Sequence, residues 1–392
     1  MKILQLNVTA NWGSTGKITE GIGLAAIRKG WESYIAYGRD HNPSQSKTIK
    51  VGSQFDVYKH YIQSKLFDSE GFGSLKSTKR LIKQIENVCP DIIHLHNIHD
   101  HWLNYPVLFN YFSSIDTPII WTFHDCWAFT GGCFHFDNVG CYQWRNELCS
   151  GKCPLFHPQS SRNFQIRKQV FNRLQERLHI VSVSDWLANY VRQSFFSESQ
   201  TTITVIRNGI DTQTIFRPST RKKKNLVLGV SNIWTIDKGI EDFYALREFI
   251  PSDTKFLLVG LSKKQIKALP EGLEGIERTN DSKELAALYQ DASVFVNPSY
   301  NDSFPTVNLE ALACGTPVIT YRTGGSPEAV DKNTGLVVNK GDINGLANGI
   351  MHILNHPDEF SSEACRNRAL KLFNKDIQFN KYIDLYESLL NK

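Results

Sequence analysis

The chain has 392 residues and a formal net charge of +5, and 41% of its residues are hydrophobic against 21% charged. This is the mixture of a globular protein, so disorder, collagen-like repeats and coiled coils are excluded, and the charge is too weak to imply nucleic acid as a partner. At about 150 residues per domain, the length predicts two domains. The sequence opens without a signal-peptide stretch and contains no apolar run of about 18 residues, which predicts a cytoplasmic protein without membrane spans.

The first half of the sequence alternates strand-like and helix-like patterns. Residues 2–8 predict a strand, a Gly-bearing loop follows, and a helix-period run over residues 18–26 precedes a second strand over residues 34–37. Later apolar runs cover residues 91–95, 118–123, 179–183 and 202–206. This alternation predicts a parallel, doubly wound α/β sheet in a first domain of residues 1–207.

A turn-rich, basic segment over residues 208–224 interrupts this pattern and is predicted to link the two domains. A second α/β series follows over residues 225–370, with strand-like runs at residues 226–230, 256–259, 294–297, 317–320 and 336–338. Residues 371–392 have helical spacing and predict a terminal helix. Because ligands of open parallel sheets bind at the carboxyl ends of the strands, two such domains predict a ligand cleft between them.

Four cysteines lie in a polar insertion of the first domain at about residues 126–158, namely Cys133, Cys141, Cys149 and Cys153. Four thiolates suit a tetrahedral Zn²⁺ with a structural role, because four protein ligands leave no open position for chemistry. Their spacing departs from that of a CxxC ribbon. Reduced thiols and disulfides are therefore the alternatives.

Histidines gather after two predicted strands of the first domain: His94, His96, His99, His101 and His124. His94 and His96 share one face of a strand, but no further ligand follows at a convincing metal spacing, so a metal site is not predicted there. His124, in the run Thr122-Phe123-His124-Asp125, is the strongest of the five candidates for chemistry. A hydrogen-bonded histidine at the end of a strand is the alternative.

The loop Gly13-Ser14-Thr15-Gly16-Lys17 invites comparison with a P-loop. That motif needs glycine at position 11 and Ser or Thr after the lysine. Asn11 and Ile18 stand at these two places, so a nucleoside-triphosphate hydrolase is not predicted. The local interpretation is a tight turn between a strand and a helix.

The most informative stretch is residues 301–317, NDSFPTVNLEALACGTP. A helix is predicted to start near Thr306, and its free N–H groups and positive dipole end suit a phosphate. Asp302 could accept hydrogen bonds from sugar hydroxyls, and Glu310, about one turn into the helix, could reach a ribose diol. In isolation these acids would be a turn residue and an exposed helix acid. The surrounding Phe-Pro and Ala-Cys-Gly-Thr-Pro spacing favours a ligand site.

The stretch from Asp302 to Pro317 resembles the signature of the retaining glycosyltransferases of family GT4, which have the two-domain GT-B fold. Supporting motifs occur in the order of that family: Gly13–Lys17, Trp121–Trp127, Arg207–Asp211, Lys238-Gly239, Gly324–Glu328 and Thr334–Val338. The resemblance implies two Rossmann-like domains that face an interdomain cleft, with the last helix crossing back to the first domain. Members that assemble bacterial surface polysaccharides are the most similar.

Two positions depart from the family pattern. The first acid is usually glutamate, where this chain has Asp302, and the arginine before the Lys-Gly pair is missing from Ser231-Asn232-Ile233-Trp234. Aspartate keeps the charge but has a shorter reach. Without the arginine, Lys238 and the helix N-terminus, with Lys17 or Arg207, would share the neutralisation of a diphosphate.

The resemblance implies a hexosyltransferase-like enzyme that moves a sugar, with retention, from a UDP- or GDP-sugar to a saccharide or lipid-linked saccharide acceptor. It places His124, Lys238 and Asp302 in catalysis. It places the donor against Gly16, Lys17, Arg207, Lys238, Asp302, Phe304, Thr306, Val307 and Glu310. The sequence has no Asp-x-Asp, the metal-holding motif of the other major glycosyltransferase fold. We therefore expect catalysis without a metal and no cofactor beyond the structural zinc.

Two other functions fit the same architecture. A nucleotide-sugar epimerase or hydrolase that uses histidines as acid and base would turn over a nucleotide sugar without an acceptor. A non-catalytic glycan-binding protein would bind glycans whether or not nucleotide is present. The resemblance further implies a place at the inner face of the plasma membrane, with peripheral contact to its lipids.

Overall fold

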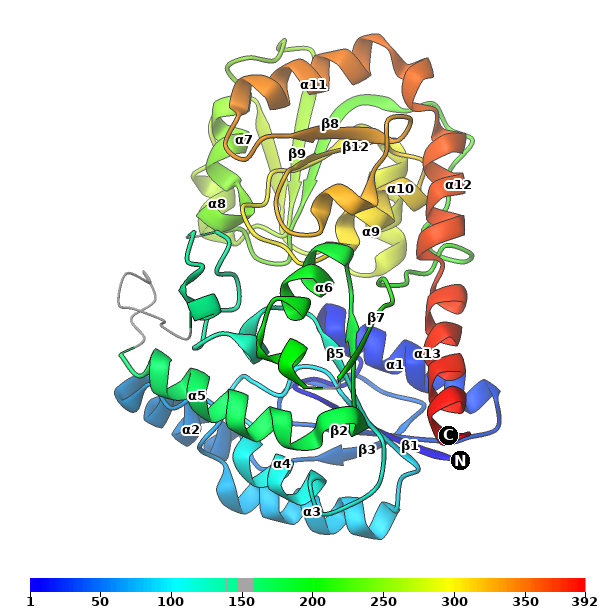
Figure 1. The fold of residues 1–392 in the computed structure, drawn as a ribbon. Helices are drawn as coiled ribbons and strands as arrows, with labels where there is room; N and C mark the ends of the chain where they lie inside the picture. The colour runs from blue at the N-terminus through cyan, green and yellow to red at the C-terminus, as the bar shows by residue number, and fades with distance from the viewer. Residues whose placement is uncertain (139, 147–157, 200, 392) are drawn as a thin grey trace. The chain divides into compact units, whose positions relative to one another are not determined.

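The computed structural model describes residues 1–138, 140–146, 158–199 and 201–391, and they form two compact units (Figure 1). The first unit comprises Met1–Arg207 and Phe379–Lys392, and the second comprises Asn208–Gln378. The segment expected to be a linker, 208–224, therefore belongs to the second unit. There Asn208 Nδ2 donates to the carbonyl oxygen of Phe304 over 3.0 Å, and Arg366 donates to the carbonyl oxygen of Thr212 over 2.6 Å.

The first unit is built on a seven-stranded parallel sheet with the strand order β3-β2-β1-β4-β5-β6-β7. Its strands are β1 Lys2–Asn7, β2 Glu32–Tyr37, β3 Lys47–Lys50, β4 Ile92–Leu95, β5 Ile119–Phe123, β6 Leu178–Ser182 and β7 Thr202–Val205. Its helices are α1 Gly13–Arg28, α2 Gln54–Phe67, α3 Leu75–Val88, α4 Tyr105–Phe112, α5 Ser160–Phe171 and α6 Asp185–Arg192, with short 3₁₀ turns at Trp127–Phe129, Gln143–Asn146, Asn172–Arg177 and Phe195–Glu198.

The second unit has a six-stranded parallel sheet with the order β10-β9-β8-β11-β12-β13. Its strands are β8 Lys224–Val230, β9 Lys255–Val259, β10 Leu273–Ile276, β11 Ala292–Asn297, β12 Val318–Tyr321 and β13 Gly335–Val338. Its helices are α7 Ile240–Leu246, α8 Lys263–Lys267, α9 Ser282–Asp291, α10 Thr306–Ala313, α11 Ile343–Asn355 and α12 Ser362–Phe373, with 3₁₀ turns at Ile236–Lys238, Ser326–Ala329 and Pro357–Phe360.

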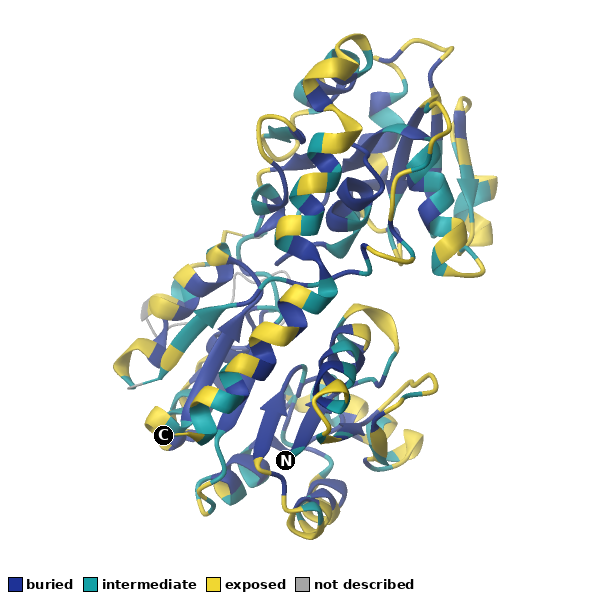
Figure 2. Cartoon of the chain, turned by 90° about the vertical axis from the view of Figure 1, so that its right-hand side faces the viewer, coloured by how far each residue is buried: buried dark blue, intermediate teal, exposed yellow. Residues whose placement is uncertain are grey.

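The apolar runs of the sequence became the central strands because helices cover both faces of each sheet. All five residues of β5 and all four of β12 are buried, as expected for parallel strands with no solvent face. Figure 2 shows this as dark blue strands beneath helices whose outer faces are yellow. Two strands, β3 and β10, have no counterpart among the predicted strands. Both lie at a sheet edge and are largely exposed or half-buried, so they lack a continuous apolar run.

In each sheet the strand order reverses once, between β1 and β4 in the first unit and between β8 and β11 in the second. Loops on either side of such a point diverge and leave room for a ligand at the carboxyl ends of the strands. The loop after β1 leads into the Gly13–Lys17 turn, and the loop after β11 leads to Asp302. The sheet order thus positions both motifs that the sequence analysis identified.

The last helix, α13 Lys375–Leu390, starts in the second unit and ends in the first. Phe379, Tyr382, Ile383 and Tyr386 are each at most 4% exposed and join the apolar cluster of the first sheet. Gly21 on α1 makes room for them, because a Cβ there would lie 2.1 Å from the Phe379 ring. At about 1.5–3 kcal/mol for each large side chain, this burial anchors the helix.

The polar side chains buried in this contact form hydrogen bonds with one another. His94 Nδ1 lies 2.6 Å from the Tyr386 hydroxyl, and His94 Nε2 lies 2.8 Å from Thr122 Oγ1. Thr122 Oγ1 donates to the Tyr382 hydroxyl over 3.3 Å, so it accepts from His94 Nε2. His94 Nδ1 then accepts the Tyr386 proton, and the imidazole is neutral.

We expect the Tyr386→Phe variant to lose about 1–3 kcal/mol of unfolding free energy, because it leaves the buried His94 Nδ1 without a donor. Urea unfolding of both variants at pH 7.5 measures this as a lower midpoint. Tyr382→Phe is the matched control, since it removes only the longer bond from Thr122. A loss in Tyr386→Phe no larger than that in the control would contradict this assignment.

Candidate functional site

The second unit brings Lys238 and Asp302 together, although they lie 64 residues apart in sequence. Lys238 Nζ donates to Asp302 Oδ2 over 3.1 Å, and it lies 3.3 Å from both Ser299 Oγ and the carbonyl oxygen of Asn301. The side chains of Lys238 and Asp302 are 33% and 26% exposed. The ammonium group is therefore held in one place and remains accessible to an anionic ligand.

Two glycines allow the close backbone packing that positions Lys238 and Asp302. Gly239 follows Lys238 with φ +74°, and a Cβ there would lie 2.4 Å from the carbonyl oxygen of Pro298. Gly324 has φ +52°, and its Cβ would lie 1.7 Å from the carbonyl oxygen of Asp302, which accepts from the Gly325 N–H over 3.1 Å. Both Lys238-Gly239 and the Gly324-Gly325 turn thus pack against the loop that carries Asp302.

Helix α10 begins directly after this loop with its N-terminus uncapped. Pro305 occupies the N-cap position without a side-chain hydrogen bond, and the first turn has no acidic residue. The first N–H groups, at Thr306 and Val307, precede any intrahelical bonding and carry the positive end of the helix dipole. A helix start of this kind is suited to bind an anion such as a phosphate.

Phe304 contributes backbone rather than side chain to this loop. Its ring is 3% exposed and packs against Phe373 with centroids 5.9 Å apart. The carbonyl oxygen of Phe304 accepts from Asn208. Any contact between Phe304 and a donor would therefore be made by its N–H group.

Glu310 lies one turn inside α10 and is half-buried. The Tyr289 hydroxyl, from α9, donates to Glu310 Oε2 over 3.1 Å. Burial and the nearby Glu310 carboxylate raise the pKa of Tyr289 well above its ordinary value, so the hydroxyl stays a donor. Sequence reasoning missed Tyr289 and Ser299, because their residue types have no motif and only the fold brings them to the acids.

Three buried polar atoms of this region have no hydrogen-bond partner among the described residues: Ser303 Oγ, Asn308 Nδ2 and Ser326 Oγ. They come from the loop, from α10 and from the turn after β12. The other end of the Asn308 amide is satisfied, since its Oδ1 accepts from Asn297 Nδ2 over 2.8 Å. Unsatisfied buried polar groups are rare in native proteins and need a water, ion or ligand to account for them.

In the first unit, the Gly13–Lys17 loop forms the N-terminal turn of α1. This helix also begins without a side-chain cap and without an acidic residue in its first turn. Gly16 is buried, and a Cβ on it would lie 2.8 Å from Thr9 Oγ1. Lys17 is exposed. Arg207, at the end of the same unit, forms an ion pair with Asp185 at the start of α6.

His124 follows β5 and stacks on His96, with ring centroids 5.5 Å apart and His96 Nδ1 3.2 Å from His124 Nε2. Burial lowers the pKa of His124 to about 4, and the neighbouring Asp125 carboxylate offsets this only in part. The imidazole is therefore neutral near pH 7. His96 Nε2 lies 3.2 Å from Gln5 Oε1, so His94 and His96 belong to a hydrogen-bonded core network.

His99 has the opposite electrostatic environment. Burial disfavours its charged form, but the carboxylates of Asp125 and Asp100 outweigh burial and raise the pKa of His99 well above its ordinary value. His99 Nε2 lies 2.9 Å from Asp125 Oδ2. Glu70 lies close enough to share a cation with His99 and Asp100. Its two oxygens, however, accept from the Asp100 N–H and from Trp127 Nε1, so the Glu70 carboxylate is already satisfied. His99 Nδ1 has no hydrogen-bond partner among the described residues and lies 3.6 Å from Asp100 Oδ1.

Two of the four predicted zinc ligands lie outside the described residues, Cys149 and Cys153. Of the other two, Cys133 is buried and Cys141 is half-buried. The zinc site stays a prediction. Among the described residues, no helix is long and apolar enough to cross a membrane.

Two family models match the chain. The model described as Glycosyltransferase Family 4 matches residues 20–214, and the model described as Glycosyl transferases group 1 matches residues 224–356. Among curated proteins, the putative colanic acid biosynthesis glycosyl transferase WcaC of Escherichia coli K12 is 26% identical over 370 residues, which cover 88% of each chain.

Solved structures agree on the architecture. Sucrose-phosphate synthase from Thermosynechococcus elongatus is similar at a TM-score of 0.75 and 22% identity, over 100% of this chain and 99% of that one. Anabaena Alr3699/HepE in complex with UDP gives a TM-score of 0.68 at 14% identity, over 99% and 100% of the two chains. The chain belongs to the GT4-type glycosyltransferases, a family of transferase enzymes, and has the GT-B fold. The family and fold predicted from the sequence are confirmed.

The histidine environments predict that acid destabilises the fold below about pH 6.5. Burial lowers the pKa of His60 and of His124 to about 4, and lowers those of His94 and His96 as well. Between about pH 6.5 and pH 4 the unfolded chain therefore binds more protons than the folded chain, and stability falls as the pH falls. The raised pKa of His99 stabilises the folded state, and this stabilisation is already complete below about pH 6.5. It therefore does not offset the loss at lower pH.

Urea midpoints at pH 7, 6 and 5 measure this dependence, which should reach up to ~2 kcal/mol for each such histidine by pH 5. Asp100 and Asp211 do not interfere, since their pKa values are lowered to about 2. Burial raises the pKa of Asp242, which adds stability as the pH falls, so the series is also run in Asp242→Asn. His124→Asn, which does not titrate, should reduce the slope. A midpoint that stays flat from pH 7 to pH 5 would exclude neutral buried histidines.

Proposed function

We propose that this protein transfers a sugar from a nucleoside-diphosphate sugar to a saccharide or lipid-linked saccharide during surface-polysaccharide assembly, with retention at the anomeric carbon. The observation that carries the proposal is the Lys238–Asp302 pair beside the uncapped N-terminus of α10, with Glu310 one turn further on. A cation, a helix N-terminus and an acid in this order fit a diphosphate flanked by a sugar and a ribose. The likeness to WcaC, a putative colanic acid biosynthesis enzyme, supports the polysaccharide setting.

We assign UDP as the nucleotide in preference to GDP. Anabaena HepE, which shares the fold, was solved with UDP, with UDP-glucose, and with UDP and glucose.

The ribose, which UDP and GDP share, is assigned to Glu310. The two hydrogen-bond acceptors of the Glu310 carboxylate match the two hydroxyls of a ribose. Tyr289 fixes one of these oxygens, so the carboxylate is oriented before the donor binds.

The proposed step breaks the bond between the anomeric carbon and the diphosphate oxygen. The electron pair stays on the departing nucleoside diphosphate, whose growing charge is stabilised by Lys238 and by the N–H groups of Thr306 and Val307. The acceptor hydroxyl attacks the same face of the oxocarbenium-like sugar, and its proton passes to the leaving diphosphate. The described residues include no carboxylate that we assign as a double-displacement nucleophile.

The remaining assigned residues bind and orient. Asp302 accepts from hydroxyls of the transferred sugar while it holds Lys238 in place. Neutral His124 of the first unit is assigned to a hydrogen bond with that sugar, and Gly16 and Lys17, with Arg207, to the donor phosphates. We further propose that catalysis needs no metal, and that the enzyme meets a lipid-linked acceptor at the inner face of the plasma membrane by peripheral contact.

The nucleotide assignment predicts saturable binding of UDP in 5 mM EDTA, with weaker or no binding of GDP, dTDP and CMP. Isothermal titration calorimetry measures each affinity. Glu310→Ala should weaken UDP by at least about tenfold, or 1.4 kcal/mol, and Tyr289→Phe should weaken it less. Tyr321→Phe is the control, because it removes another buried hydroxyl of the second unit, one that donates to Asp242.

Failure of all four nucleotides to bind would contradict the proposed function. Tight binding of GDP instead of UDP would overturn the choice of nucleotide alone. Binding that appears only after Mg²⁺ or Mn²⁺ replaces EDTA would overturn the metal independence.

The diphosphate and ribose assignments can be separated by two variants and two ligands. Lys238→Met removes a charged hydrogen-bond donor worth about 1.5–3 kcal/mol, so UDP should bind about 10–150-fold more weakly while uridine is unaffected. Glu310→Ala should weaken UDP and uridine alike. Lys263→Met, which removes an exposed lysine on α8, is the charge control. Equal losses of UDP in the two lysine variants would contradict the role of Lys238.

A further inference from the structure

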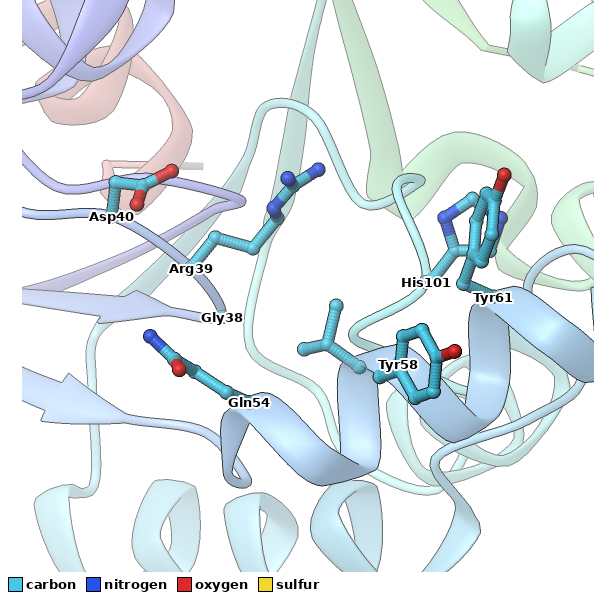
Figure 3. Close-up of a pocket in the computed structure, with 8 residues that line it drawn as sticks. Gly38, Arg39, Asp40, Gln54, Tyr58, Tyr61 and His101 are labelled. Carbon is cyan, nitrogen blue, oxygen red and sulfur yellow. The ribbon is translucent and has the colours of Figure 1, made fainter.

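A pocket of about 270 Å³ opens on the first unit and is lined by none of the residues assigned to the donor (Figure 3). Helix α2 forms one wall, the segment after β2 forms another, and the loop after β4 closes the end. The lining residues are Gly38, Arg39, Asp40, Gln54, Val57, Tyr58, Tyr61 and His101. The volume lies just below the ~300–1,000 Å³ of typical small-molecule sites, which suits one sugar ring better than a nucleoside diphosphate.

The wall on α2 presents aromatic rings to solvent. Tyr58 is 61% exposed and Tyr61 is 44% exposed. Among its described residues, α2 buries only His60, so the two tyrosines are not needed for the core. Clustered exposed aromatic side chains commonly mark a binding surface. Figure 3 shows both tyrosines and Gln54 extending from α2 around the pocket.

The ring of His101 is held beside Tyr61 by a strained loop. Asp100 and His101 both have positive φ, +70° and +68°, a conformation that costs about 1–3 kcal/mol per non-glycine residue and gathers at functional sites. The His101 ring packs edge-on against Tyr61 and His60, at centroid distances of 5.3 and 5.5 Å. Its carbonyl oxygen accepts from Ser74 Oγ over 3.3 Å.

The ring nitrogens of His101 are available to a ligand. None of the described residues hydrogen-bonds them. Burial lowers the pKa of His101, although the Glu70 and Asp100 carboxylates oppose this shift. A neutral imidazole offers one donor and one acceptor, which is the combination that a sugar hydroxyl uses.

The backbone of the opposite wall, at Gly38 and Arg39, is held in place by neighbouring side chains. Lys50 Nζ donates to the carbonyl oxygens of Gly38 and Arg39 over 2.8 and 2.6 Å. Trp102 packs on Gly38 so closely that a Cβ there would lie 2.4 Å from it. The side chains of Arg39 and Asp40 are exposed, and among the described residues neither has an ion-pair partner. Figure 3 shows both residues on the side of the pocket opposite Gln54 and Tyr58.

We propose that this pocket binds a pyranose ring of the acceptor saccharide. Tyr58 and Tyr61 stack against the C–H face of the ring, and Arg39, Asp40, Gln54 and His101 bind its hydroxyls. The two aromatic faces with a few convergent polar groups have the make-up of a carbohydrate pocket. That the sugar is the acceptor rests on the proposed function; that the pocket binds a sugar rests on the lining residues.

Saturation-transfer-difference NMR on the full chain tests the pocket. The probes are the methyl α- and β-pyranosides of glucose, galactose, mannose and N-acetylglucosamine, with UDP in parallel. We expect at least one methyl glycoside to bind the wild type. Its dissociation constant should rise at least tenfold in both Tyr58→Ala and His101→Gln, while UDP binds with unchanged affinity. Phe67→Ala is the matched control, since Phe67 is 65% exposed on the same helix but does not line the pocket.

Each other outcome is decisive. Wild-type protein that binds UDP but none of the methyl glycosides would overturn the inference and leave the donor site standing. Glycoside binding that Tyr58→Ala and His101→Gln do not weaken, or that Phe67→Ala weakens equally, would also overturn it. Glycoside binding that depends on Tyr58 and His101 without any UDP binding would support the pocket and contradict the proposed transferase function.

Discussion

Parallel strand pairing is the constraint on which the remaining structure depends. Each strand in both sheets runs in the same direction as its neighbours, so the carboxyl ends of the strands and the N-termini of many following helices share an edge. Backbone N–H groups and helix dipoles then point to that edge. The uncapped starts of α1 and α10 lie at this edge, and each follows a strand at the point where the strand order of its sheet reverses.

The residues proposed to bind the donor include few cations, and Lys238 is the one held in place beside helix α10. The arginine expected before Lys238 is absent, and one lysine stands beside the α10 N-terminus. The Asp302 carboxylate, Ser299 and the Asn301 carbonyl all hold that ammonium group. A positioned charge in a partly buried place contributes more than a mobile one, because no reorganisation is needed when negative charge develops. In the proposed function, the fixed position of Lys238 compensates for the missing arginine.

Histidines in the first unit illustrate how neighbours decide the charge of one residue type. His94, His96 and His124 are buried among one another and near no dominating carboxylate, so they are neutral. His99 meets Asp125 and Asp100 and is charged. The proposed sugar pocket lies near the same loop, where His101 is neutral and its ring nitrogens are available. The five histidines between His94 and His124 therefore include core residues, an ion-paired residue and a residue of the proposed sugar pocket.

The sequence alone determined the two doubly wound sheets, the family and the stretch around Asp302 and Glu310, because apolar periodicity and motif spacing are local properties of the chain. It did not reveal β3 and β10, whose exposed edge positions leave no apolar run. The tertiary structure alone decided which distant residues meet: Lys238 with Asp302, Tyr289 with Glu310, His94 with Tyr386, and α2 with the loop of His101. Such contacts join segments up to 292 residues apart. They depend on strand order and helix packing, which bring together residues that no local pattern relates.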